Sequence, residues 1–277
     1  MNIATNNLGT LVPGLPILTP GDVWIVGAGP GDPGLLTVHA LSALMQADVL
    51  VHDALVDQRV LNLARPGAAR VFVGKRGGKP STPQDDIVVT LIDQARRGFR
   101  VVRLKGGDPY IFGRGGEEVA ALKAAGIGHR VIPGLTAGLA GLGAVGIPAT
   151  HRGVNQAIFL ATGHGAGKQM TPDGIDWLQV AKLGQPIVLY MGLKNLPLIL
   201  SDLFAGGMAP QTPAAVIASA TTADERVLIT TADKLEEHMQ QEDFAAPVII
   251  VIGHIVACRA ELEQVVTQAA SEVVGIG

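Results

Sequence analysis

The feature that most constrains the fold is an alternation of short apolar runs with helical patterns. In the first half of the chain, runs rich in Val, Ile and Leu alternate with segments of helical periodicity. The strand-like runs span 23–29, 49–55, 70–74, 100–106 and 129–134, and the helical segments span 36–47, 86–98 and 117–126. Gly98 and Gly126 follow two of these helical patterns, where a glycine commonly ends a helix. This alternation predicts a mainly parallel sheet that helices cover on both faces.

The pattern resumes in the second half of the chain. Strands are expected at 157–163, 186–192, 213–220, 226–232 and 247–253, with a helix around 233–239. We predict an α/β protein of two α/β domains with mainly parallel or mixed sheets. The expected parts are a tail (1–20), an N-terminal α/β domain (21–137), a glycine-rich junction (138–156), a C-terminal α/β domain (157–258) and a C-terminal helix and tail (259–277). Because open α/β sheets bind ligands beyond the carboxyl ends of their strands, the loops after these strands are the expected place for a site.

Composition excludes several classes of protein. The chain has 277 residues, 48% hydrophobic and 16% charged, which is typical of a globular protein with a large core. A net charge of −3 and an aromatic content of 4% argue against a nucleic-acid partner. The single cysteine, Cys258, excludes a disulfide framework and a cysteine-rich metal site, and it is expected to pack in a helix. His151 and His164 belong to no recognisable metal set, so no metal is predicted.

One segment resembles a membrane span in length and lack of charge. Residues 131–151 contain no Lys, Arg, Asp or Glu, but they include five glycines and two prolines. A buried, glycine-packed junction explains this composition better. The N-terminus lacks the basic start and continuous apolar stretch of a secretory signal. We therefore expect a cytoplasmic enzyme without a membrane partner.

The loop GAGPGDPG at 27–34 raises a first functional hypothesis. It contains G-x-G-x-x-G after a strand, with Asp53 about 20 residues further on, as in dinucleotide-binding folds. That turn depends on backbone N–H donors, and Pro30 and Pro33 each remove one. We interpret the loop as a ligand loop of another kind, with an NAD(P)-dependent oxidoreductase as an alternative. A second glycine loop, 163–168, lacks the first glycine and the final Ser or Thr of a nucleotide-binding P-loop.

The most specific segment is RLKGGDPYIFGRGGEE at 103–118. Gly106 and Gly107 follow a strand and let backbone amides approach a ligand closely. Arg114 stands between glycines, and Glu117 occupies the expected first turn of a helix. Arg114 and Glu117 also fit a surface pair at i,i+3. Arg103 and Lys105, at the end of the strand, are expected to be solvated.

Together these motifs resemble a known family. GAGPGDPGLLT, VHDALV, GKRGGKPS, RLKGGDPYIFGRGGEE, PGLTAG, GIPATHRG, TGH and YMG occur in the order found in uroporphyrinogen-III C-methyltransferases of the tetrapyrrole methylase family, over about residues 21–258. The resemblance implies a homodimer of two-domain chains with an active-site cleft between the domains. It also implies S-adenosylmethionine as cofactor, S-adenosylhomocysteine as product, and methylation of uroporphyrinogen III at C2 and C7 to give precorrin-2. Such products lead to cobalamin, sirohaem or haem d1.

The resemblance also implies site residues. Cofactor-binding positions carried over by motif are Pro30, Gly106, Gly107, Asp108, Ile111, Thr136, Ala137 and Met191. Ala220 and Val248 are carried over by strand alignment, although the run FAAPV departs from the PPA-like run common in relatives. Substrate-facing or catalytic positions are Asp53, Arg114, Glu117, Arg152 and Tyr190.

The chemistry of methyl transfer fits these residue types. Transfer from a sulfonium requires alignment of donor and acceptor carbons and exclusion of water. Amides at 106–107 and 136–137 are expected to meet the methionyl carboxylate, although Thr136 equally fits a helix N-cap. Because the chain is acidic, local cations must bind the acid arms of the substrate. We hypothesise that Arg114 and Arg152 clamp these arms, with Lys75, Arg76 and Lys79 as further candidates, and that Glu117 holds Arg114 or assists proton removal.

Two further alternatives stay open at this point. A methyltransferase acting on a later precorrin would share the same loops. A non-catalytic module would bind a tetrapyrrole without consuming S-adenosylmethionine.

Overall fold

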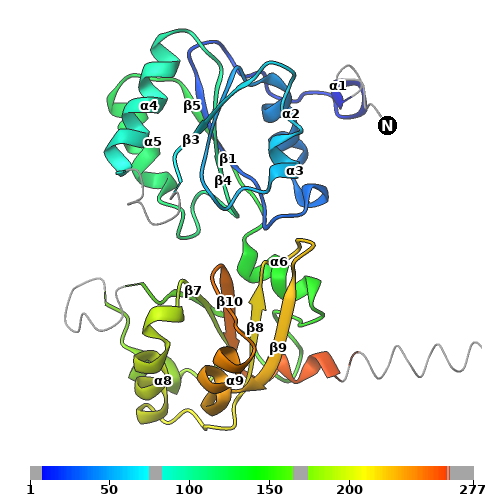
Figure 1. Cartoon of the computed structure of the whole chain (residues 1–277), viewed down its shortest axis with the longest axis vertical. Helices are drawn as coiled ribbons and strands as arrows, with labels where there is room; N and C mark the ends of the chain where they lie inside the picture. Colours follow the sequence, from blue (N-terminus) through cyan, green and yellow to red (C-terminus); the bar gives the residue numbers. More distant parts are fainter. Residues whose placement is uncertain (1–7, 75–82, 165–173, 261, 263–277) are drawn as a thin grey trace, which may run out of the picture. The chain divides into compact units, whose positions relative to one another are not determined.

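The chain forms two compact units, each built on one sheet. The computed structural model describes residues 8–74, 83–164, 174–260 and 262. The units span Met1–Thr136 and Ala137–Gly277. Figure 1 labels their elements along the chain.

The sheet of the first unit has five parallel strands in the order β3-β2-β4-β1-β5. Each strand predicted for this half is present. Their bounds are β1 Val23–Gly27, β2 Val49–His52, β3 Ala69–Phe72, β4 Val101–Lys105 and β5 His129–Ile132. Since every strand runs the same way, all the carboxyl ends lie at one edge of the sheet.

Helices cover both faces of this sheet, as predicted (Figure 1). Alternate residues of β1 enter different cores, with Trp24 and Val26 in one and Val23 and Ile25 in the other. The helices are α1 Leu8–Leu11, α2 Val38–Gln46, α3 Gln58–Leu61, α4 Gln84–Arg96 and α5 Gly115–Ala124. α2 and α3 pack on the Trp24 face, whereas α4 and α5 pack on the Ile25 face. Gly98 and Gly126 follow α4 and α5 with φ of 81° and 70°, which confirms the predicted helix ends.

The sheet of the second unit is mixed, with the order β6-β7-β10-β8-β9. β6 and β7 are parallel, and the other neighbours are antiparallel. The strands are β6 Phe159–Thr162, β7 Ile187–Tyr190, β8 Pro213–Ala218, β9 Arg226–Thr231 and β10 Val248–Ile252, all within the predicted runs. The prediction of mainly parallel or mixed sheets is therefore confirmed.

Helices also cover both faces of the second sheet. α7 Trp177–Lys182, α8 Leu196–Ala205 and α9 Leu235–Gln241 share one core with Ile187, Leu189 and Val216. α6 Ala137–Ala144 packs on the opposite face, where Gly138 approaches Val188 and Gly141 approaches Ile217. Four short 3-10 turns complete the described elements, at Pro33–Leu35, Leu193–Asn195, Ala232–Lys234 and His254–Val256.

The single cysteine and the uncharged segment 131–151 both belong to the folded part of the chain. Cys258 is buried, as expected for a packing residue. Within the described ranges, no helix is both long enough and apolar enough to span a bilayer. The uncharged segment 131–151 instead contains the end of β5 and all of α6.

One ion cluster ties the start of β2 to the start of β4. Oδ2 of Asp48 accepts hydrogen bonds from the backbone N and from Nε of Arg100, at 2.8 and 3.0 Å. Oδ1 accepts from Nη2 of Arg100 at 2.9 Å and also from Arg65. Arg100, chiefly, lowers the pKa of the Asp48 carboxyl from 3.8 to about 2.

Asp48→Asn is therefore expected to cost about 1–2 kcal/mol of unfolding free energy at pH 7, once solvent screening is allowed for. The folded pKa lies below the unfolded value, so the stabilisation is present above pH 3.8 and is lost as pH falls toward about 2. Urea denaturation of both proteins across this range measures the effect. The difference should shrink on acidification. Glu237→Gln, at an exposed ion pair, is the control and should leave the urea midpoint unchanged.

Candidate functional site

Predicted site residues of the first unit follow the carboxyl ends of its strands. Pro30 lies three residues after β1, Asp53 directly after β2, and Gly106, Gly107 and Asp108 directly after β4. Thr136 closes the segment after β5. Because the strands are parallel, the sheet brings these loops together at one edge.

Three glycines let these loops touch through their backbones. A Cβ atom added at Gly27 would lie 2.7 Å from the carbonyl oxygen of Gly107, and one added at Gly134 would lie 2.3 Å from the same atom. Gly29 and Gly107 also exchange backbone hydrogen bonds, of 3.2 and 2.7 Å. Only residues without side chains allow the β1, β4 and β5 loops to approach so closely.

This pairing corrects one expectation. The Gly107 amide was expected to face a ligand carboxylate, but its N–H donates to the carbonyl of Gly29. Gly107 has φ of 67°, and it joins two loops. The N–H of Gly107 is therefore engaged within the loops, whereas no contact of Gly107 with a cofactor is tested by this geometry.

The Asp108 carboxylate also joins two loops. Its Oδ2 accepts a hydrogen bond from the N of Gly134 at 3.0 Å, and its Oδ1 accepts from the N of Tyr110 at 2.7 Å. Ile111, two residues beyond Pro109, is half-buried. Thr136 is buried and Ala137 begins α6, so the position of Thr136 fits either a helix N-cap or a ligand contact.

Arg114 is held by its neighbour on α5. Its Nε and Nη2 donate to Oε1 and Oε2 of Glu117 at 2.9 and 2.6 Å, and both side chains are 56% exposed. The hydrogen bond to Glu117 raises the pKa of Arg114, and the same bond lowers the pKa of Glu117. Arg114 therefore stays a cation, which suits an anion-binding group and not a base.

The loops at this edge are strained and apolar. Phe112 and Arg114 have φ of 53° and 58°, in the left-handed region that non-glycine residues seldom adopt. Large apolar side chains are exposed in the same loops, namely Leu55, Tyr110, Phe112 and Leu135. An apolar rim beside a fixed cation suits a ligand that is partly apolar and partly anionic.

The second unit gathers its predicted residues in the same way. Tyr190 ends β7 opposite Ile249, and Val248 begins β10 opposite Ala218 of β8. Met191 and Ala220 follow β7 and β8, so all four predicted positions lie at one edge of this sheet. Strain occurs here too, since Met191, Ser219 and Thr221 have φ between 49° and 64°. Met191 is exposed, whereas Ala220 and Val248 are buried.

Tyr190 differs from a freely exposed substrate contact. It is 9% exposed, and its Oη accepts a hydrogen bond of 3.0 Å from the backbone N of Gly138. A Cβ atom at Gly138 would lie 2.2 Å from this oxygen. The hydroxyl therefore fixes the first turn of α6 against β7.

Tyr190→Phe is expected to lower the unfolding free energy by about 1–2 kcal/mol, because the Gly138 amide loses its buried acceptor. Denaturant unfolding of both proteins tests this. Thr230→Val, which removes a hydroxyl bonded to His238 on a partly buried surface, is a matched control with an expected cost below ~1 kcal/mol. An unchanged midpoint in Tyr190→Phe would contradict the role assigned to the hydroxyl.

Arg152 lies in an exposed loop of the second unit. Asn155 shapes this loop, since its Nδ2 donates to the carbonyls of Ala149 and Ala157, both at 3.0 Å, and its Oδ1 accepts from the N of His151. Arg114 and Arg152 thus belong to different units. The further cation candidates Lys75, Arg76 and Lys79 lie outside the described residues.

The loop with the G-x-G-x-x-G pattern does not open a helix directly. Asp32 accepts a hydrogen bond from the N of Gly34 and caps a 3-10 turn at Pro33–Leu35. α2 begins only at Val38, with Thr37 as its N-cap. A dinucleotide turn requires the glycines to lead straight into the helix N-terminus, so this geometry argues against it.

A family model for tetrapyrrole (corrin/porphyrin) methylases matches residues 22–236. The chain belongs to the tetrapyrrole methylase family. It is 50% identical to a uroporphyrinogen-III C-methyltransferase of Sinorhizobium over 91% of this chain and 90% of that protein. It is 46% identical to a siroheme synthase of Methylococcus capsulatus, but spans only 51% of that protein's length. The solved structure of uroporphyrin-III C-methyl transferase from Thermus thermophilus, complexed with S-adenyl homocysteine, is 37% identical and superposes with a TM-score of 0.72, covering 86% of this chain and 99% of that one.

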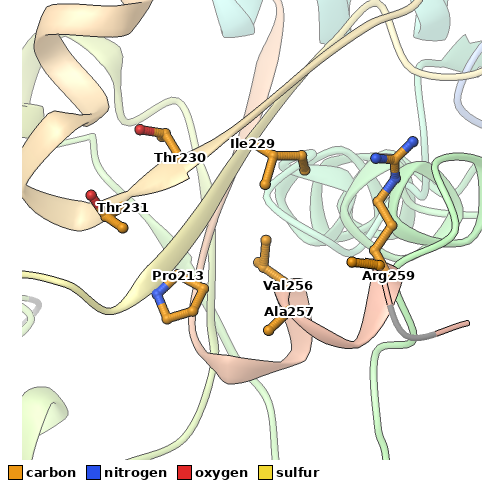
Figure 2. A pocket seen from close by; sticks show the side chains of 8 residues that line it. Pro213, Ile229, Thr230, Thr231, Val256, Ala257 and Arg259 are labelled. Atoms are coloured by element: carbon orange, nitrogen blue, oxygen red, sulfur yellow. The ribbon is translucent and has the colours of Figure 1, made fainter. Parts of the chain in front are cut away.

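This methylase also has an apolar pocket in its second unit that the sequence did not indicate. Its volume is about 230 Å³, and Figure 2 shows Ile229 and Val256 facing each other across it. The lining residues are Pro213, Ile229, Thr230, Thr231, Val256, Ala257, Arg259 and Ala260. Pro213 pairs with Thr231 at the start of β8, the end opposite to Ala220 and Val248. The pocket therefore lies at the other end of β8 from these two predicted positions.

The expectation that Arg103 and Lys105 are solvated is wrong. The two side chains are 3% and 5% exposed, because β4 is an inner strand and its alternate residues face α5. Both bind Oε1 of Glu118, which is fully buried. Among the described residues, no group of three or more His, Cys, Asp or Glu side chains is placed to hold a metal ion.

Proposed function

We propose that this methylase is an S-adenosylmethionine-dependent uroporphyrinogen-III C-methyltransferase. It converts uroporphyrinogen III to precorrin-2 by methylation at C2 and C7 and releases S-adenosylhomocysteine. The observation that carries this proposal is the 50% identity to a uroporphyrinogen-III C-methyltransferase across nine-tenths of both chains. The solved relative complexed with S-adenyl homocysteine supports the choice of cofactor.

The residues at the strand edges suit this cofactor. A sulfonium methyl donor supplies a carbon that an electron-rich pyrrole can attack directly, so the protein has to provide alignment and a dry site. Glycine-closed loops allow backbone to approach the methionyl part closely, and the exposed apolar rim suits the adenosine and the macrocycle. The proposed cofactor positions are Pro30, Gly106, Gly107, Asp108, Ile111, Thr136, Ala137, Met191, Ala220 and Val248.

Arg114 and Arg152 are proposed to bind the carboxylate arms of the substrate. A guanidinium can donate two parallel hydrogen bonds to a carboxylate, and Glu117 fixes the Arg114 side chain. Tyr190 is proposed to act indirectly, by fixing the first turn of α6 against β7.

Methylation of a pyrrole carbon is completed by loss of a proton. We assign this proton to the Asp53 carboxylate, because Arg114 holds Glu117 through two hydrogen bonds of 2.9 and 2.6 Å, whereas the contact of Arg103 with Asp53 is a single, longer one of 3.4 Å. Asp53 lies directly after β2 with a side chain that is 26% exposed. Its Oδ1 accepts from the N of Leu55 at 3.1 Å, which fixes the carboxylate at the sheet edge.

Assembly and location are proposed from the same family resemblance. We propose a homodimer that acts in the cytoplasm on a small-molecule tetrapyrrole, with no nucleic-acid or membrane partner. Light scattering coupled to size exclusion should give twice the 28.6 kDa chain mass, and a monomer mass would contradict the dimer.

Stoichiometry tests the proposed reaction. Uroporphyrinogen III and excess S-adenosylmethionine should yield two molecules of S-adenosylhomocysteine for each tetrapyrrole consumed. A single molecule released would show that only one ring carbon is methylated and would contradict the double methylation. None released would contradict the function and would favour a methylase of a later precorrin or a non-catalytic binding module. NADH should not raise the melting temperature, whereas S-adenosylhomocysteine should.

A further inference from the structure

Two neighbouring glutamates at the start of α5 have different surroundings. Successive residues of a helix point about 100° apart, so Glu117 and Glu118 face different sides. Glu117 is exposed and binds Arg114. Glu118 is fully buried against the sheet. The proposed function uses Glu117 and gives Glu118 no part.

Glu118 is the centre of a buried ionic cluster. Its Oε1 accepts from Nε of Arg103 at 3.2 Å, from Nζ of Lys105 at 3.1 Å and from Nε2 of Gln84 at 3.1 Å. Within the part of the chain that the structure describes, its Oε2 has no hydrogen-bond partner. A buried carboxylate with an unpaired oxygen is costly, so this cluster is poorly explained by stability alone.

The cluster extends to Asp53 through Arg103. Nη2 of Arg103 lies 3.4 Å from Oδ2 of Asp53, while Nη1 donates to the carbonyl of Leu104 at 3.0 Å. The guanidinium is thus held on one side by Glu118 and presented to Asp53 on the other. Burial, followed by the charge of Arg103, lowers the pKa of Lys105, as expected for two cations that share one carboxylate oxygen.

We propose that Glu118 is a positioning residue for the methyl-transfer reaction, acting through Arg103 on the Asp53 carboxylate. Glu118 fixes the Arg103 guanidinium, and Arg103 fixes Oδ2 of Asp53 while the Leu55 amide fixes Oδ1. The first turn of α5 then serves the site twice, since Glu117 holds Arg114 and Glu118 orients Asp53. This inference rests on the proposed function, and in particular on the role given to Asp53.

A double-mutant cycle on turnover tests the proposal. Glu118→Gln should lower kcat ~10-fold while the KM for S-adenosylmethionine changes less than ~2-fold, because the lost interaction orients a reacting group. In an Asp53→Asn background, the same substitution should lower single-turnover rates by less than ~2-fold. Equal effects in both backgrounds, or an unchanged kcat in Glu118→Gln alone, would overturn the proposal. Glu237→Gln, at an exposed ion pair of the second unit, is the control and should retain the wild-type kcat.

A double-mutant cycle on the free energy of unfolding measures the coupling of Glu118 to Asp53 without an assay of turnover. Asp53 and Glu118 both pair with Arg103, and Glu118 also pairs with Lys105. When one carboxylate is neutralised, the remaining one is the only anion that offsets these buried cations, so its removal destabilises the fold more. The urea midpoint should therefore fall further on Glu118→Gln when residue 53 is Asn. Additive shifts would overturn the link through Arg103.

The two cycles also separate this inference from the proposed function. A wild-type protein that fails to methylate uroporphyrinogen III contradicts the function, while the stability cycle still decides the link. If Glu118→Gln fails to fold, Arg103→Lys replaces it in both cycles and is again combined with Asp53→Asn. Lysine keeps the charge but lacks the planar guanidinium that contacts both Glu118 and Asp53. The same coupling pattern is expected, and additivity would again overturn the proposal.

Discussion

Replacement of Gly134 with alanine is expected to lower the unfolding free energy by more than ~3 kcal/mol and to abolish binding of S-adenosylhomocysteine. The added Cβ would lie 2.3 Å from the carbonyl oxygen of Gly107 and 2.9 Å from the Cα of Gly27. All these neighbours are backbone atoms of loops tied to β1 and β4, so none can move cheaply. Urea denaturation and calorimetric titration measure the two effects.

Gly143→Ala is the matched control for this substitution. Gly143 lies in α6, and a Cβ atom there would meet nothing within 4 Å. Alanine in a helix is favoured over glycine by about 0.5–1 kcal/mol, so stability should be unchanged or slightly raised. A Gly134→Ala protein with a wild-type midpoint would show that the glycine-closed edge is not rigid.

Arg114→Lys is expected to lower kcat/KM for uroporphyrinogen III ~10–100-fold while stability changes by less than ~0.5 kcal/mol. Lysine keeps the charge but cannot make the two parallel bonds that a guanidinium makes to a carboxylate. Both the Arg114 and Glu117 side chains are largely exposed, so the ion pair between them contributes little to folding. Initial rates at several substrate concentrations, together with urea denaturation, give both quantities.

Arg59→Lys supplies the comparison. Arg59 is an exposed arginine of the same unit that pairs with Asp57 at 3.0 Å, and no role in the site is assigned to it. Its replacement should leave kcat/KM at the wild-type value. Near-normal kcat and KM in Arg114→Lys would exclude the proposed clamp on the acid arms.

The strands and the location of the site could be predicted from the sequence because their signals are local. Short apolar runs place the ten strands found among the described residues, and the loops after them follow from the direction of the strands. Glycines at 98 and 126 mark helix ends because their conformation is disfavoured for other residues. The motifs of the family then identify which loops matter.

Contacts between residues far apart in the sequence could not be predicted from these local patterns. Arg103 and Lys105 look like solvated residues at a strand end, and only the packing of α5 on β4 reveals that Glu118 buries them. The Gly107 amide looks free until the β1 loop is seen to pair with it. Tyr190 likewise meets Gly138, which is 52 residues away along the chain. Two charged residues at alternate positions of an otherwise apolar strand, Arg103 and Lys105, are a local signal that could have indicated the buried cluster.

The most direct test of the account is to follow the transferred carbon. Uroporphyrinogen III incubated with ¹³C-methyl S-adenosylmethionine and the wild-type protein should yield a tetrapyrrole that has gained two labelled methyl groups, with ¹³C NMR placing them on C2 and C7. A tetrapyrrole of unchanged mass, or label on any other carbon, would contradict the proposed function.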